Sequence, residues 1–349
     1  MRFIEFRSFS IWINVAIFAV AAGLVWMAGT RLARYADAIA ARTRLTRAFL
    51  GLILLGIATS LPEVATTVTG AALGNAQLVA GNLFGGVALQ IAVLAVIDSI
   101  AVRGTLTYFT PQPVLLFQGT MLLLLLALAL AGAAASEPVT IAGLGLTPLL
   151  LVLGYVMTIR YSQPGDHLPR WRATNQPDVP RQPGNFREPL EGVSNRVLFG
   201  YCVVSSVAIL AAGWALAQTG DALAEQTQLG SSFIGVALVA GSTSLPELST
   251  GLAAVRQGNH EMAVANILGT NCLEVALFCL ADLVYRGGPI LAAVDQSAIF
   301  ARALGMVVTC IYLLGLLERR NRTVLNMGLD SLGVLVAYVV GLMALYTLR

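Results

Sequence analysis

The feature that most constrains this chain is a polar hexapeptide that occurs twice inside otherwise apolar stretches. The first copy is Ala58-Thr59-Ser60-Leu61-Pro62-Glu63, and its last five residues return as Thr243-Ser244-Leu245-Pro246-Glu247. At this offset of 184 residues, segments 58–90 and 242–274 align without a gap and share 11 of 33 residues. An internal duplication of this kind predicts two structurally related halves.

The rest of the chain is apolar enough to require a membrane. Hydrophobic residues make up 57% of the 349 residues, charged residues only 11%, and the mean hydropathy is +0.79, which exceeds what a water-soluble domain buries. Ten windows reach the length of about 20 residues that crosses the hydrocarbon layer. They lie near 10–30, 45–73, 76–99, 112–132, 139–159, 195–217, 229–256, 260–284, 297–317 and 327–348.

These windows divide into two sets of five around one polar segment. We expect a first repeat at 1–160, a proline-rich extended linker at 161–195 and a second repeat at 196–349. If the linker is cytoplasmic, 16 of the 21 arginines lie on that side, as the positive-inside rule requires. Because each repeat has an odd number of spans, the halves are inverted. The predicted fold is an all-α membrane protein of ten transmembrane helices in two inverted five-helix repeats.

The two hexapeptides predict broken helices, numbers two and seven, that carry cation ligands. Pro62 and Pro246 cannot donate to the carbonyl one turn earlier, which leaves backbone oxygens free. Glu63 and Glu247 place carboxylates beside those oxygens. The neighbouring hydroxyls belong to Thr59, Ser60, Thr243 and Ser244. An all-oxygen set favours hard cations such as Ca²⁺ over zinc or copper, although a simple proline kink with hydroxyls bonded to their own helix is the alternative.

The third and eighth helices contribute further repeat-matched polar residues. Gln90 and Glu274 occupy equivalent positions, one turn beyond Asn82–Gly86 and Asn266–Thr270. Gln90 could instead make an interhelical hydrogen bond, whereas Glu274 is a third carboxylate at membrane depth. Asp98 and Asp282 also match, at span ends, where we expect interfacial caps or, alternatively, a gating role.

Other functional classes find little support in the residues. All basic residues are arginine, which does not by itself predict nucleic-acid binding, and we expect no nucleic-acid partner. The cysteines, Cys202, Cys272, Cys279 and Cys310, lie in apolar stretches and are expected to pack as small hydrophobic residues. We find no nucleophile–base pair, phosphate loop or nucleotide motif, so no enzyme, catalytic residue or cofactor is predicted.

The paired motifs resemble the calcium/cation antiporters, a superfamily that includes the sodium/calcium exchangers. The likeness rests on Thr59–Glu63 with Gly81–Gly85 and on Thr243–Glu247 with Ala265–Asn271. The resemblance implies that Glu63 and Glu247 are the central cation ligands, beside the backbone oxygens of Thr59 and Thr243. It also implies that Ser60, Ser244 and Thr270 help to form flanking sodium sites.

Three residues depart from the family pattern. Gly86 stands where the family usually has serine, Gln90 where it has asparagine, and Glu274 where it has aspartate. We expect a secondary active antiporter in a plasma membrane, such as a bacterial inner membrane, that exchanges Ca²⁺ for Na⁺ by alternating access. The alternatives are a proton-coupled exchanger, a channel, and a transport-inactive scaffold or sensor. The expected partners are inorganic cations and the lipid bilayer, and the sequence does not predict an oligomeric state.

Overall fold

A computed structural model describes residues 6–40, 59–102, 104–141, 143–162, 193–256 and 258–348. Within these ranges seven helices are long and apolar enough to cross a membrane. Two shorter apolar segments, Leu146–Ser162 and Ser231–Thr243, accompany them. The chain is therefore a multi-pass membrane protein. The seven spans are Ile11–Leu32, Ala76–Ala101, Pro113–Ala134, Arg196–Thr227, His260–Val284, Gln296–Glu318 and Leu329–Thr347.

The elements follow the predicted order, with two additions. The helical elements are η1 (Phe6–Ser8), α1 (Ile11–Ala40), α4 (Leu61–Ala72), α5 (Ala76–Ala101), α6 (Pro113–Ala134), α7 (Leu146–Ser162), α8 (Asn195–Thr227), α9 (Ser231–Ile234), η3 (Gly235–Val239), α10 (Ala240–Thr243), α11 (Leu245–Arg256), α12 (His260–Val284), η4 (Ile290–Ala293), α13 (Gln296–Glu318) and α14 (Leu329–Thr347). The additions are two short hairpins, β1 (Thr140–Ile141) with β2 (Leu144–Gly145), and β3 (Thr323–Val324) with β4 (Met327–Gly328).

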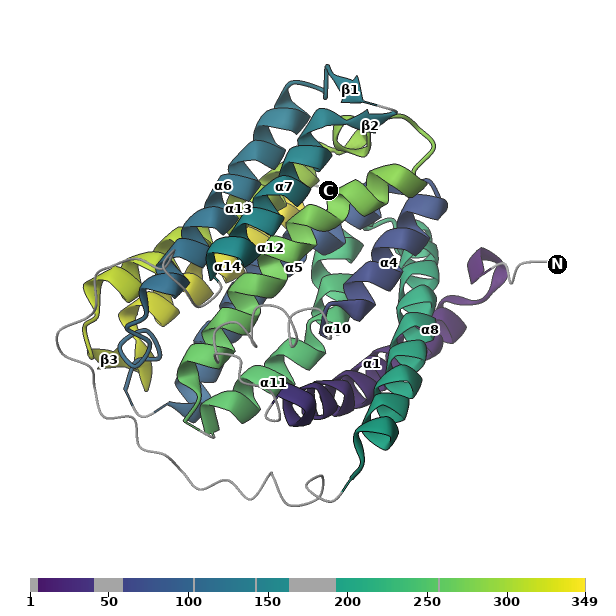
Figure 1. The fold of residues 1–349 in the computed structure, drawn as a ribbon. Helices are drawn as coiled ribbons and strands as arrows, with labels where there is room; N and C mark the ends of the chain where they lie inside the picture. Colours follow the sequence, from purple (N-terminus) through teal and green to yellow (C-terminus); the bar gives the residue numbers. More distant parts are fainter. Residues whose placement is uncertain are drawn as a thin grey trace.

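The hairpins correct the predicted windows 139–159 and 327–348, whose first residues form strands. In each case the helix begins only after the second strand. Strands of two residues are too short to show an alternating pattern of polar and apolar residues. The predicted apolar windows therefore included the strand residues. Leu325 and Asn326 both have positive φ in the β3–β4 turn, as a tight two-residue hairpin turn requires. The two hairpins lie at opposite ends of the helix bundle (Figure 1).

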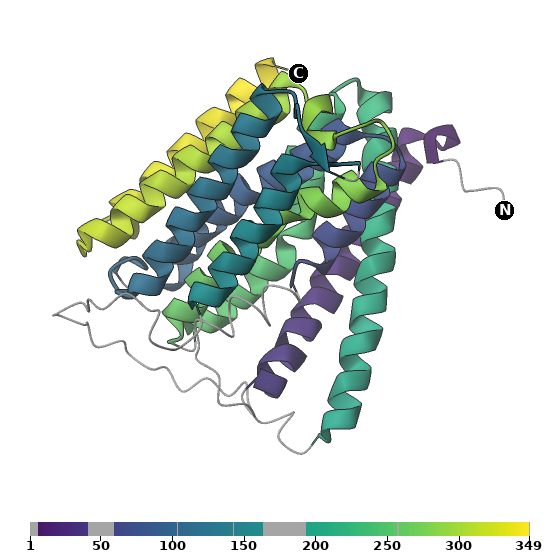
Figure 2. The ribbon, with the colours of Figure 1, turned by 45° about the horizontal axis from the view of Figure 1, so that its top comes forward.

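The bundle is layered around α5 and α12. In the most apolar windows of these two helices, 78% and 72% of the residues are buried, against 17% in α1 and 28% in α8. Both helices carry polar side chains, such as Asn82 on α5 and Asn266 and Glu274 on α12, and in a membrane span such side chains face the protein interior and not lipid. Their contact includes Phe84 and Phe278, whose rings stack with centroids 4.5 Å apart. Helices α1 and α8 lie side by side at the edge of the bundle (Figures 1 and 2).

Asp98 and Asp282 hold the hairpins in place. Asp98 accepts hydrogen bonds from the backbone N–H groups of Leu106 (2.7 Å) and Gly328 (2.8 Å). Asp282 accepts equivalent bonds from Ile290 (2.6 Å) and Gly145 (2.7 Å). Each carboxylate thus binds its own loop and the hairpin of the other half of the chain. This confirms the predicted capping role and adds the crossed partner that the sequence did not indicate.

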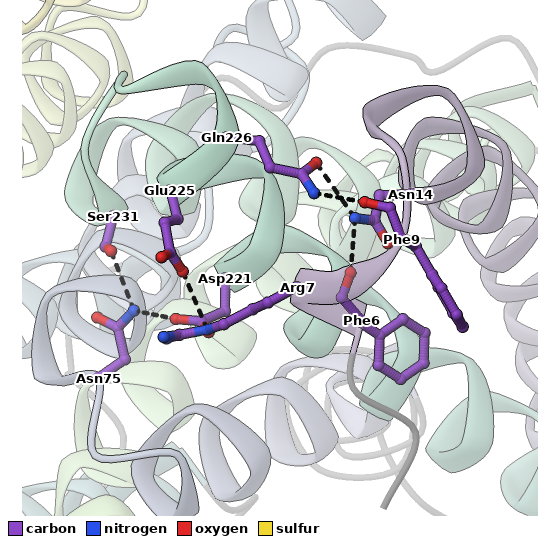
Figure 3. Close-up of polar contacts among 9 residues, drawn as sticks. All are labelled: Phe6, Arg7, Phe9, Asn14, Asn75, Asp221, Glu225, Gln226 and Ser231. Atoms are coloured by element: carbon purple, nitrogen blue, oxygen red, sulfur yellow. Dashed lines mark hydrogen bonds and ion pairs between the residues drawn. The ribbon is translucent and has the colours of Figure 1, made fainter.

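A polar cluster ties the α1–α8 pair to the start of α5 (Figure 3). Arg7 forms ion pairs with Asp221 (2.8 Å) and Glu225 (3.2 Å) of α8. The hydrogen bond and negative charge of Asp221 raise the pKa of the Arg7 guanidinium. The second oxygen of Asp221 accepts a bond of 2.6 Å from Asn75, whose own side chain caps α5. Asp221 therefore connects the edge pair to the central layer.

Other sequence predictions lie partly outside the described ranges. The window 45–73 is described only from Thr59 onward, and Ala58 lies outside, as does nearly all of the linker 161–195. Helices α1 and α8 extend beyond the predicted windows 10–30 and 195–217. None of the four cysteines forms a disulfide, and Cys272 is buried in the core, in line with the predicted packing role.

Candidate cation site

The two proline motifs break their helices in the same way. The residue before each break, Ser60 or Ser244, has nearly identical backbone angles: φ −81° and ψ 3° in the first copy, φ −82° and ψ 5° in the second. A new helix then begins at Leu61 or Leu245, with the proline in its first turn, where its missing N–H is tolerated. The second break is preceded by the π-helical turn η3, which also disturbs the regular ladder. The helix break predicted at Pro246 is observed.

Glu63 and Glu247 are buried without hydrogen-bond donors of normal geometry on any of their four carboxyl oxygens. Their exposed fractions are 1% and 0%. Each interacts with the threonine hydroxyl of the opposite copy, Glu63 with Thr243 and Glu247 with Thr59. The charges of Glu247 and Glu274 also act on Glu63. Unsatisfied carboxyl groups in a hydrocarbon environment are costly unless a cation joins them.

A matched pair of hydrogen-bond chains fixes the backbone around these acids. Thr66 donates to the carbonyl of Glu63 (3.1 Å) and accepts from the amide of Asn82 on α5 (2.9 Å). In the other copy Thr250 donates to the carbonyl of Glu247 (3.2 Å) and accepts from Asn266 on α12 (3.5 Å). The sequence analysis did not predict Thr66 and Thr250 as positioning residues. The two copies of the repeat hold the same residue at this position, 184 residues apart, and this identity could have indicated them.

Gln90 and Glu274 contact each other where α5 crosses α12. The Gln90 amide donates to Glu274 Oε1 and lies 3.5 Å from the Ser244 hydroxyl. Glu274 Oε2 has no hydrogen-bond partner, and it lies 2.6 Å from the position that a Cβ of residue 86 would occupy. Any larger residue at position 86 would require this carboxylate to shift. The three departures from the family pattern therefore form one contiguous group.

Two glycines of the edge helices pack on the proline breaks, a feature the sequence analysis missed. A Cβ at Gly29 of α1 would lie 2.5 Å from Cγ of Pro246. A Cβ at Gly213 of α8 would lie 2.5 Å from Cβ of Ala65 and 3.1 Å from the carbonyl oxygen of Pro62. These glycines are also 184 residues apart. Each edge helix thus packs closely against the break of the opposite half, at a position where a side chain larger than glycine would clash.

The predicted site residues gather in the interior between α4, α11, α5 and α12. All are at most 2% exposed. Thr270 lies one turn before Glu274, and its hydroxyl is buried without a partner, as are the amide atoms of Asn271. In the described part of the chain no three His, Cys, Asp or Glu side chains are arranged as a metal cluster. The donors are instead carboxylates mixed with hydroxyls and amides: Thr59, Ser60, Glu63, Gln90, Thr243, Ser244, Glu247, Thr270 and Glu274. Oxygen-only donors of this kind suit Na⁺ and Ca²⁺.

The chain is similar in sequence to known membrane proteins. A family model described as sodium/calcium exchanger protein matches residues 13–162 and 197–347. The chain is similar to the putative antiporter CaxA of Alkalimonas amylolytica, with 26% identity over 307 residues that cover 86% of this chain and 89% of the relative. It is also similar to the sodium/calcium exchanger MaX1 of Methanosarcina acetivorans, with 30% identity over 128 residues, or 36% of this chain and 35% of that protein.

Two solved structures share the fold. A structure of the sodium-calcium exchanger NCX_Mj, soaked with Na⁺ and Sr²⁺, matches with a TM-score of 0.63 at 16% identity, over 96% of this chain and 99% of that chain. The structure of native YfkE matches with a TM-score of 0.65 at 13% identity, over 95% and 92% of the two chains. At these identities the likeness concerns the fold alone.

Proposed function

The chain belongs to the sodium/calcium exchanger protein family, and on this premise we propose that it exchanges Ca²⁺ for Na⁺ by alternating access at the buried acids. Family membership and the antiporter relatives support cation antiport by this chain. The single observation that carries the calcium assignment is the pair Glu63 and Glu247, fully buried with four carboxyl oxygens that lack regular hydrogen bonds. A divalent cation between them would meet these unsatisfied acceptors.

The proposed architecture is the ten-helix inverted repeat. Hairpins at opposite ends of the bundle, together with the crossed contacts of Asp98 and Asp282, support two halves that run in opposite directions. Contacts between equivalent residues, such as Gln90 with Glu274, support a pseudo-twofold axis through the site. In such folds the ion site lies where the broken helices meet near the middle of the membrane.

The proposed mechanism follows from the charge of the site. Ca²⁺ neutralises the two carboxylates of Glu63 and Glu247, and several Na⁺ ions in overlapping positions replace that charge. A loaded site then permits the conformational switch, whereas an empty and doubly negative site does not. Because an ion shifts an equilibrium only through its different affinities for the two states, loss of either carboxylate should abolish exchange.

A proton-coupled exchanger is the second candidate, and one group of residues favours it. Gly86 removes the hydroxyl expected at a flanking sodium site, and Glu274 Oε2 has no partner. A proton carried by an acid of this site would replace the missing sodium ion.

For the location and orientation of the protein, we propose a plasma membrane with the linker on the cytoplasmic side, which the arginine distribution supports.

Calcium uptake by proteoliposomes tests both candidates. We expect an outward sodium gradient to drive ⁴⁵Ca²⁺ uptake, and a proton gradient without sodium to drive little. Uptake driven by protons alone would favour the second candidate. Glu63→Gln should abolish uptake, whereas Glu225→Gln, at an exposed carboxylate of α8, serves as the control. Exchange at the wild-type rate by Glu63→Gln would exclude the assigned site.

A further inference from the structure

Arg302 of α13 is a fully buried positive charge within a membrane span. Its exposed fraction is 0%, and it is the largest of the fully buried side chains in the described residues. The guanidinium donates one hydrogen bond, from Nη1 to the carbonyl of Ala129 on α6, and lies over the ring of Phe84 at 4.1 Å from the ring centroid. Nε and Nη2 have no hydrogen-bond partner. Arginine inside a span is costly and usually pairs with an acid.

Within the described ranges, no carboxylate forms an ion pair with Arg302. A cation–π contact with Phe84 and one carbonyl compensate only part of the cost of removing a guanidinium from water. Negative charge near the guanidinium, even without contact, would supply part of the remainder.

The stacked rings lead from Arg302 to the acids of the cation site. Phe84 contacts Arg302 and stacks on Phe278 of α12. Phe278 lies one helical turn after Glu274, on the same face of α12. The same two helices meet at Gly86 of α5, which lies against the Glu274 carboxylate. The guanidinium and the site therefore share one region of the interior.

Only the second half of the repeat has a positive charge at this position. At the 184-residue offset, the equivalent of Arg302 is Gln118 on α6. Gln118 is also fully buried, but it is neutral and bonds to the hydroxyl of Ser162. The fold thus accommodates a neutral polar side chain at this position in the first half. The charge of Arg302 is an asymmetric addition.

We propose that Arg302 is a fixed counter-charge that sets how much cation charge the site takes. This inference rests on the proposed cation site. With Glu63, Glu247 and Glu274 ionised, the acids carry three negative charges, and Arg302 reduces the net charge of the region to minus two. One divalent cation then balances the region, whereas without Arg302 a third positive charge from a further ion would be needed. Arg302 acts at a distance, so it is a specificity-determining residue and not a ligand.

Coulomb's law gives the expected size of the effect. One helical turn plus the two ring contacts place the guanidinium on the order of 12 Å from the acids of the site, and a bound ion lies at a similar distance. At an effective dielectric constant of about 20, removing the charge should tighten binding about tenfold for a monovalent ion and about a hundredfold for a divalent ion. The fold-change for Ca²⁺ should therefore be roughly the square of that for Na⁺. A packing defect would not produce this relation.

The test measures Ca²⁺ and Na⁺ affinities of the purified full chain by titration calorimetry. Arg302→Gln introduces the residue that the other half already uses, Arg302→Met is a second neutral variant, and Arg302→Lys keeps the charge. Arg320→Gln, at an exposed arginine, is the control. We expect tighter binding with the squared relation in both neutral variants, and affinities within about threefold of the wild type for the lysine variant and the control.

Three results would overturn the proposal. They are equal fold-changes for the two ions, weaker binding in the neutral variants, and failure of both neutral variants to fold while Arg302→Lys folds and binds like the wild type. The last result would assign the charge a purely structural role. Failure of the proposed function is distinguishable, because Glu63→Gln would then retain exchange whatever Arg302 does.

Discussion

The contact between Gly86 and Glu274 predicts that substitutions at these two residues are coupled. Gly86→Ser restores the residue usual in the family, yet its Cβ would lie 2.6 Å from Glu274 Oε2, closer than such atoms approach. The carboxylate would have to move away from Gln90. Glu274→Asp alone shortens the acid by one methylene and withdraws it from the same amide. Each single variant should therefore weaken the site, whereas the double variant has room for both side chains.

Typical energies set the expected size of this coupling. Overpacking a well-filled interior costs about 1–3 kcal/mol, and loss of a hydrogen bond to a charged group costs about 1.5–3 kcal/mol. Each single variant should thus bind Ca²⁺ roughly 5- to 150-fold more weakly. In the double variant the combined loss should fall below the sum of the two by about 1–3 kcal/mol, as for residues in direct contact.

The assay is a double-mutant cycle on the calcium concentration that gives half-maximal uptake, with the thermal unfolding midpoint as a second readout. Gly23→Ser is the matched control, since a Cβ at Gly23 of α1 meets no atom within 4 Å. We expect this control to behave like the wild type. Additive losses, with a coupling below about 0.5 kcal/mol, would refute the argument that the longer acid fills the space left by the glycine.

Three other features lead to predictions. Asp98→Asn and Asp282→Asn should each lower stability by about 1–3 kcal/mol, because the amide turns an N–H toward one of its two backbone donors; unchanged thermal midpoints would contradict this. Asp221→Ala removes the tie between α8 and α5, so we expect stopped-flow measurements to show a changed transport rate at unchanged calcium affinity, and a changed affinity alone would argue against it. Gly213→Leu cannot pack against Pro62 and should abolish uptake while calcium binding in detergent persists; wild-type uptake would show that this close approach is dispensable.

The sequence alone predicted the parts of the fold that depend on hydropathy and on backbone chemistry. Long apolar runs defined the spans, and Pro246 located the break that the structure places at Ser244. The carboxylates at 63 and 247 were predicted at membrane depth and are buried. These predictions needed only local information, because burial in lipid leaves few conformations for the backbone.

The features that the sequence did not predict depend on contacts between distant residues. Asp98 was recognised as a cap, but nothing in its neighbourhood indicates Gly328 as its partner. Gly29 looked like any small residue of an apolar span until Pro246 was found against it. The substitutions at Gly86 and Glu274 looked like separate departures, and only their contact shows that one accommodates the other. Such relations require three-dimensional proximity, which residue type and spacing along the chain do not contain.

The crossed hydrogen bonds of the hairpins also set the order in which the protein can mature. Asp98 enters the membrane with the first half of the chain, but one of its two donors, Gly328, is synthesised 230 residues later. At ribosomal rates of about 5–20 residues per second, this carboxylate waits roughly 10–50 s for its partner. During biogenesis the first half therefore lacks part of its hydrogen bonding and is exposed to quality-control proteases. A chain truncated after the linker should be degraded.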